Sequence, residues 1–246
     1  MNSHKIRIAK LLANYNQGSR REIEKLINQK KIYLNKKLVI TPVTFASTND
    51  EIFIKNKKIE FNKKKIEILK FYKPKNIICS KKKQDQRKII YEIIKPKYKN
   101  YIFSGRLDFK SEGLIILTNS SIIARNLELP SNNFERTYEV RVFGNLELNH
   151  LKNLSKGSEI DKVNYKPFKF KIKSKIKKNT NIEMTLQEGK KNEIRKIFKS
   201  INMQVNRLKR ISFGPFLLNK MQPGEIKKVT NAEKKIYENY FRNKKR

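Results

Sequence analysis

One carboxylate draws attention in the middle of the chain, within the stretch SGRLDFKSEGLIILTNS at residues 104–120. Asp108 follows the strand-like segment YIFSGRL and precedes GLIILTN, a nearly continuous apolar run that is typical of a buried central strand. Gly105 permits unusual backbone angles just before it. An Asp in such a connection either bonds nearby backbone N–H groups in a turn or acts chemically as a carboxylate. The local pattern leaves both interpretations open.

The residues that would support metal, redox or disulfide chemistry are few. The chain has one cysteine, Cys79, and two histidines, His4 and His150. An intramolecular disulfide needs two cysteines, and protein zinc or iron sites are built from several Cys and His ligands. We therefore expect no protein-built metal site.

The charge of the chain indicates a polyanionic partner. Lysine and arginine number 59 of the 246 residues against 22 aspartate and glutamate residues, which gives a formal net charge of +37. A folded chain with this excess repels itself unless a polyanion is near, and phosphate contacts gain affinity by releasing counterions. The composition thus favours nucleic acid as the partner.

No segment has the pattern of a targeting or membrane-spanning sequence. The N-terminus, MNSHKIRIAKLLANY, lacks the long apolar run of a signal peptide. No apolar run approaches the roughly 20 residues that a membrane helix needs. We expect a soluble, cytoplasmic protein that is monomeric and makes no membrane contact.

The first 60 or so residues are predicted to form a small unit. KIRIAKLLANY places apolar residues from Ile6 to Ala13 at helical spacing. SRREIEKLINQK begins with Ser19 and Glu22, which fit a capping box at the start of a second helix. The strand-like pieces KIYLN, KKLVI and EIFIKN follow, separated by turn-forming residues.

A larger unit is predicted beyond FNKKKIE, residues 61–67, whose polar and basic composition suits a flexible linker. Strand-like runs (IEILKFY, NYIFSGRL, GLIILTN, TYEVRVFG, FKFKIK and NIEMTLQEG) are interleaved with two helical patterns, SIIARNLELP and KNEIRKIFKSI. Several runs alternate apolar with polar residues, which favours antiparallel pairing. We predict an α+β fold with domains at 1–62 and 63–230, the second a mainly antiparallel sheet with flanking helices, and a basic helical tail at 231–246.

The N-terminal unit resembles the S4 RNA-binding domain over roughly residues 4–60. SRREIEKLINQKKIYLNKK is similar to that family's pattern of Ser-Arg-Arg, a helix, and a strand that ends in Val-Asn-Gly. Lys36 stands where the Gly usually falls, so the turn is expected to differ slightly. The resemblance implies that four cations lie near RNA phosphates: Arg7, Lys10, Arg20 and Arg21. From the residues alone, they could equally form an ordinary solvated helix face.

The stretch around Asp108 resembles the signature of the pseudouridine synthases that act on small- and large-subunit ribosomal RNA. That signature reads Gly-Arg-Leu-Asp, two variable residues, Thr, one variable residue, Gly, and an apolar strand that ends in Thr-Asn-Asp-Gly. Here Ser111 replaces the Thr and keeps its hydroxyl, while Ser120-Ser121 replace the Asp-Gly. Serine serves as well as aspartate for capping the helix that is predicted to start there.

Further blocks of this family occur in order along the chain. YKPKNIICS is similar to its Lys-Pro-x-Gly segment, in which Lys73 and Pro74 are expected to shape a loop beside the active site. Asn76 replaces the Gly, and asparagine tolerates a positive φ better than other residues. ERTYEVRVFG resembles the block with the active-site tyrosine, here Tyr138. In LQEGKKNEIRKIF, followed by VNRLKRISFGP, the family's basic position falls on Arg195. The resemblance is nearest to the large-subunit enzymes designated B.

The resemblance implies the conversion of uridine to pseudouridine without a cofactor. Asp108 would start the reaction as a nucleophile or as a base on the ribose, ionised in a buried pocket, with Arg195 offsetting its desolvation. Tyr138 would stack on the base and accept the proton from C5. Arg106 would contact phosphate or fill the gap left by the flipped uridine, because chemistry on a base requires that it leave its stack.

Three functions remain open from the sequence. The leading hypothesis is an isomerase acting on large-subunit (23S) ribosomal RNA. The second keeps the chemistry but places the target uridine in small-subunit ribosomal RNA or elsewhere in the large subunit. The third is an assembly factor that binds ribosomal RNA without catalysis, although such a binder has no need for Asp108, Tyr138 and Arg195 together.

Overall fold

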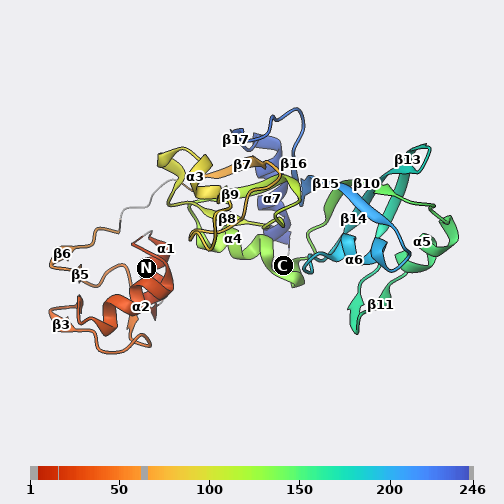
Figure 1. The fold of residues 1–246 in the computed structure, drawn as a ribbon. Coiled ribbons are helices and arrows are strands. Elements are labelled where there is room, and N and C mark those ends of the chain that lie inside the picture. The colour runs from red at the N-terminus through yellow and green to blue at the C-terminus, as the bar shows by residue number, and fades with distance from the viewer. Residues whose placement is uncertain (1–4, 16, 62–65, 244–246) are drawn as a thin grey trace. The chain divides into compact units, whose positions relative to one another are not determined.

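The computed structural model describes residues 5–15, 17–61 and 66–243 (Figure 1). Two compact units make up the chain, one comprising residues 1–67 with 119–122 and the other residues 68–118 with 123–246. Residues 62–65 of the predicted linker lie outside the described residues, as does His4. The two units are described separately below.

The first unit combines two helices with short antiparallel strands (Figure 1). Its elements are β1 (Ile6–Arg7), α1 (Ile8–Asn14), α2 (Arg20–Asn28), β2 (Ile32–Leu34), β3 (Lys37–Leu38), β4 (Phe45–Ala46), β5 (Ile52–Ile54) and β6 (Lys57–Lys58). Strand β1 pairs with β4, and the other four form a sheet in the order β3-β2-β5-β6. Ile8, Leu12, Ile23, Ile27 and Ile32 belong to a single buried cluster that joins the helices to the sheet.

Local chemistry sets the helix start and the tight turn of this unit. The predicted capping box is present, because the Glu22 backbone N–H donates to Ser19 Oγ (3.3 Å) and the Ser19 N–H donates to the Glu22 carboxylate (2.7 Å). Ile6 was expected in the first helix but lies in β1, since α1 begins only at Ile8. Lys36, in place of the expected Gly, adopts a left-handed φ of 67° in the turn between β2 and β3.

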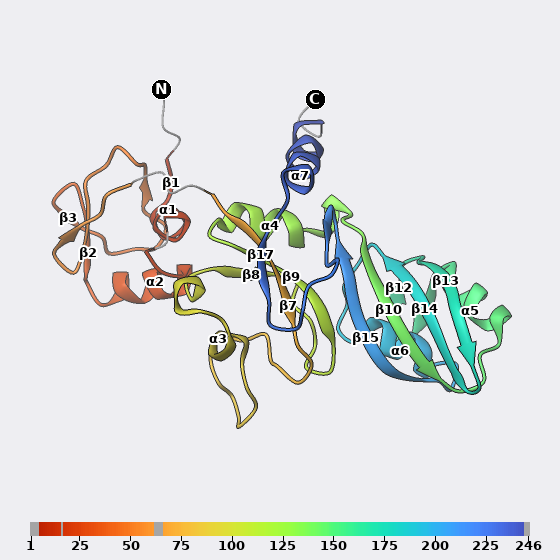
Figure 2. The same cartoon turned by 90° about the horizontal axis from the view of Figure 1, so that it is seen from above.

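The second unit is built on a nine-stranded sheet in the order β13-β14-β10-β15-β9-β7-β17, with β16 on β15 and β8 on β9 (Figure 2). The strands are β7 (Ile68–Lys73), β8 (Ile102–Ser104), β9 (Glu112–Thr118), β10 (Arg136–Phe143), β13 (Lys169–Ile176), β14 (Asn179–Leu186), β15 (Gln204–Phe213), β16 (Phe216–Leu217) and β17 (Ile226–Lys228). A separate hairpin consists of β11 (Ser158–Ile160) and β12 (Val163–Tyr165). All pairs in the sheet are antiparallel except β9 with β15.

Helices accompany this sheet, and the buried residues form two clusters. The helices are α3 (Ile90–Ile93), α4 (Ser121–Glu128), α5 (Leu148–Ser155), α6 (Glu193–Lys199) and α7 (Asn231–Asn243), with 3-10 turns at Pro96–Tyr98 and Pro130–Asn132. Alternate residues of β9 belong to different clusters. Ile115 and Leu117 join the cluster with α3, α5 and α6, whereas Leu114 and Ile116 join the cluster with α4 and α7. Both faces of β9 are therefore covered, which accounts for its continuous apolar sequence.

The predicted strands and helices of this unit are present, with two informative differences. YIFSGRL was expected to be one strand, but β8 ends at Ser104 because Gly105 turns the chain with a φ of 72°. VNRLKRISF was not predicted as a strand, yet it forms most of β15, which lies between β10 and β9. Its buried positions, Val205, Leu208, Arg210 and Phe213, do not alternate regularly because the pairing with β10 has register shifts, and one of them is an arginine that is 2% exposed.

The last helix packs onto the second unit through its N-terminal turn. Glu233 accepts a hydrogen bond from the Lys70 ammonium on β7 at 2.8 Å, and both side chains are buried. It also accepts from the backbone N–H groups of Leu217 (2.9 Å) and Thr230 (2.7 Å). The segment predicted as a basic tail, 231–246, thus contributes α7 to this unit, and residues 244–246 lie outside the described residues.

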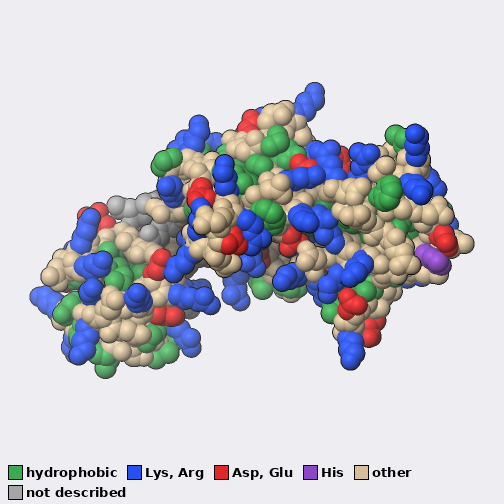
Figure 3. All heavy atoms as spheres, in the orientation of Figure 1, with side chains coloured by type: hydrophobic (Ala, Val, Ile, Leu, Met, Phe, Trp, Pro, Cys, Tyr) green, Lys and Arg blue, Asp and Glu red, His purple; other side chains and the backbone are tan. Residues whose placement is uncertain are grey.

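The visible surface of both units is rich in cations. Lys and Arg side chains are spread over the face drawn in Figure 3, where Asp and Glu are fewer. In the ranges that the structure describes, no helix is both long and apolar enough to cross a membrane.

Candidate active site

Asp108 lies in the loop between β8 and β9, and its side chain is exposed. The Asp108 carbonyl accepts a hydrogen bond from the Ser111 N–H (3.0 Å), which closes a tight turn. Among the described residues, the carboxylate has no hydrogen-bond or ion-pair partner. We expected it in a buried pocket, but its neighbour Leu107 takes the buried position (8% exposed) and leaves Asp108 facing solvent.

Two glycines allow the ends of this loop to lie close against β15. Gly105 has a φ of +72°, and a Cβ added there would lie 2.5 Å from the Phe213 ring. Gly113 has a φ of +112°, and a Cβ there would lie 2.3 Å from the Arg210 carbonyl oxygen. Both distances are far shorter than a van der Waals contact. The two Gly positions of the sequence signature are therefore explained by close backbone approach and left-handed conformation.

Arg210 holds both ends of the loop from β15. Its Nε donates to the Leu114 carbonyl at 2.8 Å, and its Nη2 donates to the Gly105 carbonyl. The guanidinium lies 5.0 Å from the centroid of the Phe213 ring, close enough for a cation–π contact. No carboxylate forms an ion pair with Arg210 in the described part of the chain, so carbonyl dipoles and this ring balance its charge.

Lys73 holds the middle of the loop from β7. Its side chain is fully buried, and the ammonium donates to the carbonyls of Ser111 (2.7 Å), Pro74 (2.9 Å) and Phe109 (3.5 Å). Burial lowers the pKa of Lys73 to about 8, while the charge of Asp108 is among those that oppose the shift. The expectation that Lys73 shapes a loop beside the site agrees with these contacts.

Asn76 supports the same part of the loop. Its N–H donates to the Phe109 carbonyl at 2.9 Å, and its φ of 59° confirms the positive φ expected where the family has Gly. The Ser111 hydroxyl, expected to replace a Thr hydroxyl, is buried, and no described group hydrogen-bonds to it.

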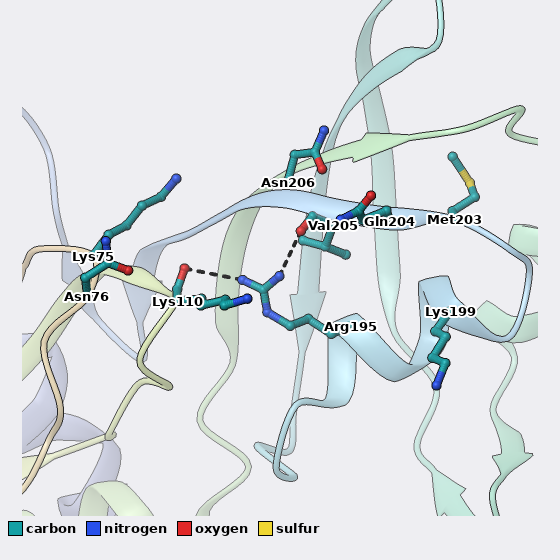
Figure 4. Close-up of a pocket in the computed structure, with 9 residues that line it drawn as sticks. All are labelled: Lys75, Asn76, Lys110, Arg195, Lys199, Met203, Gln204, Val205 and Asn206. Carbon is teal, nitrogen blue, oxygen red and sulfur yellow. Dashed lines mark hydrogen bonds between the residues drawn. The ribbon is translucent and has the colours of Figure 1, made fainter. Parts of the chain in front are cut away.

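Arg195 projects from α6 toward the loop (Figure 4). Its guanidinium donates to the carbonyls of Val205 (2.8 Å) and Lys110 (3.3 Å). Burial lowers the pKa of Arg195, and the charge of Asp108 opposes that shift. We expected an ion pair between the two residues. The structure contains none within 4.0 Å among the described side chains, because the guanidinium donates to carbonyl oxygens instead.

Tyr138 lies on β10, opposite Met184 on β14 and Arg210 on β15. Its side chain is 8% exposed and belongs to the same apolar cluster as Leu107 and Ile194, the residues next to Asp108 and Arg195. Of the three residues predicted to carry the chemistry, only Tyr138 belongs to this cluster itself, whereas Asp108 and Arg195 each follow one of its members in the sequence.

The residues predicted to contact RNA are all exposed. Arg106 precedes Leu107 in the Asp108 loop, and Arg7, Lys10, Arg20 and Arg21 lie on β1, α1 and α2 of the first unit. None of the five has an ion-pair partner within the described ranges. They are available for phosphate contacts, which is a necessary condition for the predicted role.

The residue that the sequence interpretation missed is Arg210. The signal lay in VNRLKRISF, where Val205, Leu208, Arg210 and Phe213 are the buried positions. A cation at an inward position of a strand costs desolvation unless it has a specific partner.

Within the described residues, no group of three or more His, Cys, Asp or Glu side chains is placed to hold a metal ion.

Comparison with known proteins identifies both units. Residues 67–200 match the family described as RNA pseudouridylate synthase, and residues 6–52 match the S4 domain. A protein of Rickettsia felis named "Uncharacterized RNA pseudouridine synthase" is 36% identical, over 92% of this chain and 97% of that protein. A "Ribosomal large subunit pseudouridine synthase B" of Buchnera aphidicola subsp. Baizongia pistaciae is 35% identical, over 87% and 89% of the two chains.

A solved structure shows the same fold. The crystal structure of a pseudouridylate synthase matches with a TM-score of 0.65 and 23% identity, covering 94% of this chain and 98% of the other. At this identity the match supports the fold alone.

Proposed function

The chain belongs to the RNA pseudouridylate synthase family, and from that premise we propose that it isomerises a uridine of large-subunit ribosomal RNA, with Asp108 as the reactive carboxylate. The relative named large-subunit synthase B supports this choice of RNA, because 35% identity extends over most of both chains. The S4 domain adds a second RNA-binding unit.

The observation that carries the proposal is the contrast between Asp108 and its loop. The loop backbone is held by three cations, since Arg210 bonds to Gly105 and Leu114, Lys73 to Phe109 and Ser111, and Arg195 to Lys110. The carboxylate at its tip is exposed. A rigid loop that presents one carboxylate suits attack on a bound substrate better than it suits turn formation.

The reaction balances without a cofactor. The bond between N1 of uracil and C1′ of ribose breaks, the detached uracil rotates, and C5 bonds to C1′. The proton on C5 is lost and N1 gains one, so substrate and product are isomers. Asp108 starts this sequence at the ribose, which it can reach once the uridine has left its stack.

Tyr138 and Arg195 have supporting roles in this proposal. Tyr138 stacks on the uracil and accepts the C5 proton, a role that the resemblance of ERTYEVRVFG to the family's tyrosine block supports. Arg195 holds the loop through its hydrogen bond to the Lys110 carbonyl, two residues after Asp108, and supplies a positive charge beside the site. The exposed residues Arg106, Arg7, Lys10, Arg20 and Arg21 contact RNA phosphates.

Incubation of the purified protein with separate transcripts of large- and small-subunit ribosomal RNA tests this function. Carbodiimide treatment followed by primer extension would locate each pseudouridine. We expect one modified position in the large-subunit transcript. Modification of the small-subunit transcript instead would assign the other substrate. If the protein binds both transcripts but forms no product on them or on assembling ribosomal subunits, it is a non-catalytic assembly factor.

A further inference from the structure

A pocket of about 640 Å³ next to the Asp108 loop contains only cationic, amide and apolar side chains (Figure 4). Its lining consists of Lys75, Asn76, Lys110, Arg195, Lys199, Met203, Gln204, Val205 and Asn206. The four cations come from three segments: the residues after β7, the Asp108 loop and α6. No carboxylate lines the pocket in the described part of the chain, so its potential is positive.

The lysines of this pocket differ from the buried lysines of the same unit. The ammonium of Lys73 is engaged by carbonyls and that of Lys70 by Glu233. By contrast, Lys110 and Lys199 are exposed, and neither ammonium has a hydrogen-bond or ion-pair partner among the described residues.

Lys75 is only weakly neutralised. Its ammonium lies 4.0 Å from Glu112, whose carboxylate already accepts from Arg207 (2.8 Å) and from the Tyr72 hydroxyl (2.7 Å). Arg195 uses its guanidinium to bond to the Val205 and Lys110 carbonyls. The pocket thus carries three ammonium groups that point in different directions around it, with amide side chains between them (Figure 4).

The pocket shares a wall with the candidate active site. Lys110 follows Asp108 by two positions, and the Asn76 N–H bonds to the carbonyl of Phe109 between them. A ligand in the pocket would therefore lie next to a nucleotide held at Asp108. Lysine is a frequent phosphate-binding residue, acting as a point charge.

We propose that the lysines of this pocket bind backbone phosphates of the RNA next to the nucleotide held at Asp108. The proposal rests on the proposed function for the identity of that neighbour. An RNA phosphate is favoured over a free phosphate because the pocket opens beside a site of an RNA-modifying family and the lysines are exposed. Occupation of the pocket would fix the register of the RNA without reading its sequence.

Lys199→Gln and Lys110→Gln test this site in the full chain, with Lys152→Gln as the control. Lys152 is an exposed residue of α5 that does not line the pocket, and its substitution removes the same charge. The affinity for a transcript of large-subunit ribosomal RNA is measured over a series of salt concentrations. We expect each pocket variant to make the negative slope of log K against log salt shallower by about 1 and to weaken binding about fivefold near physiological salt, whereas the control changes neither.

Unchanged slopes in both pocket variants, or an equal change in Lys152→Gln, would overturn the phosphate site. Binding of inorganic phosphate at Lys199, detected by NMR, without any loss of RNA affinity in the pocket variants would identify a free-phosphate site and overturn the RNA assignment. Pseudouridine formation is assayed separately. If the wild type forms no product but the slopes change as expected, the proposed function is contradicted and the phosphate site is supported. If product forms normally but the slopes are unchanged, the phosphate site is contradicted and the proposed function is supported.

Discussion

At the scale of single residues, the environment of each carboxylate sets its role. Asp108 is exposed at the tip of a held loop, whereas Glu112, four residues later, is 7% exposed and bonded to Arg207 and Tyr72. The hydrogen bond to Glu112 is one cause, after burial, that raises the pKa of Tyr72 to about 12. Glu112 is thus occupied by structural contacts, and Asp108 remains available for substrate.

A buried carboxylate gives a residue-scale prediction about pH. Burial raises the pKa of Glu193 to about 7, and the charge of Glu188 adds to the shift. Between the unfolded pKa of 4.5 and about 7, the folded state binds more protons than the unfolded state, so stability falls as pH rises through this window. Glu193→Gln removes this dependence. One pKa unit corresponds to about 1.4 kcal/mol. Between about pH 5 and about pH 8, we therefore expect the free energy of unfolding of the variant to rise by ~2 kcal/mol relative to that of the wild type.

Urea unfolding at both pH values measures this difference. Glu159→Gln is the matched control, because Glu159 is exposed on β11 and the substitution removes the same charge. Parallel pH profiles for the wild type and Glu193→Gln would show that Glu193 does not titrate in this window.

At the scale of elements, the Asp108 loop depends on strands far from it in sequence. Strand β15 supplies Arg210, which bonds to both ends of the loop, and β7 supplies Lys73, which bonds to its middle. The bond from Arg210 to Leu114 spans 96 residues of sequence. The geometry of the Asp108 loop is therefore a property of the assembled sheet.

Arg210→Met tests this dependence. Methionine has a side chain of similar length but no guanidinium. The substitution therefore leaves the carbonyls of Gly105 and Leu114 without these donors. We expect a loss of ~2–4 kcal/mol in the free energy of unfolding and a larger loss of pseudouridine formation than of RNA affinity. Arg141→Met, at an exposed position of β10, is the control. A variant with wild-type turnover at temperatures where it stays folded would show that the loop needs no support from β15.

Much of the fold was predictable from the sequence, for identifiable reasons. The apolar run GLIILTN indicated β9, and Ser19 with Glu22 indicated the start of α2, because these signals are local. Strand β15 was missed because its buried positions are irregularly spaced and one of them holds Arg210. The exposure of Asp108 and the carbonyl partners of Arg195 were also not predictable, since they depend on how the loop packs against α6 and the sheet.

At the scale of the whole molecule, a net charge of +37 is shared by an S4 domain and a catalytic domain. Both units carry exposed cations on the visible face (Figure 3). If both units contact the same RNA, their contributions to the salt dependence of the affinity add, because each neutralised phosphate releases counterions. Overall affinity is therefore expected to fall steeply with salt.

The double substitution Arg20→Gln with Arg21→Gln tests the contribution of the S4 domain. We expect the negative slope of log K against log salt to become shallower by about 2. Pseudouridine formation should fall at physiological salt and be restored when the salt concentration is lowered. Lys37→Gln with Lys57→Gln removes the same charge from exposed positions of β3 and β6 and serves as the control. Equal slopes for the two double variants would contradict a specific role of Arg20 and Arg21.

Pseudouridine formation by Asp108→Asn in large-subunit ribosomal RNA tests the proposed chemical role of Asp108 most directly. The substitution preserves the size of an exposed side chain and removes only its charge, so folding and RNA affinity should be retained. Asp161→Asn, at an exposed turn position between β11 and β12, is the matched control. We predict product at background level for Asp108→Asn and at the wild-type level for Asp161→Asn. Product formation at the wild-type rate by Asp108→Asn would contradict a chemical role for this carboxylate.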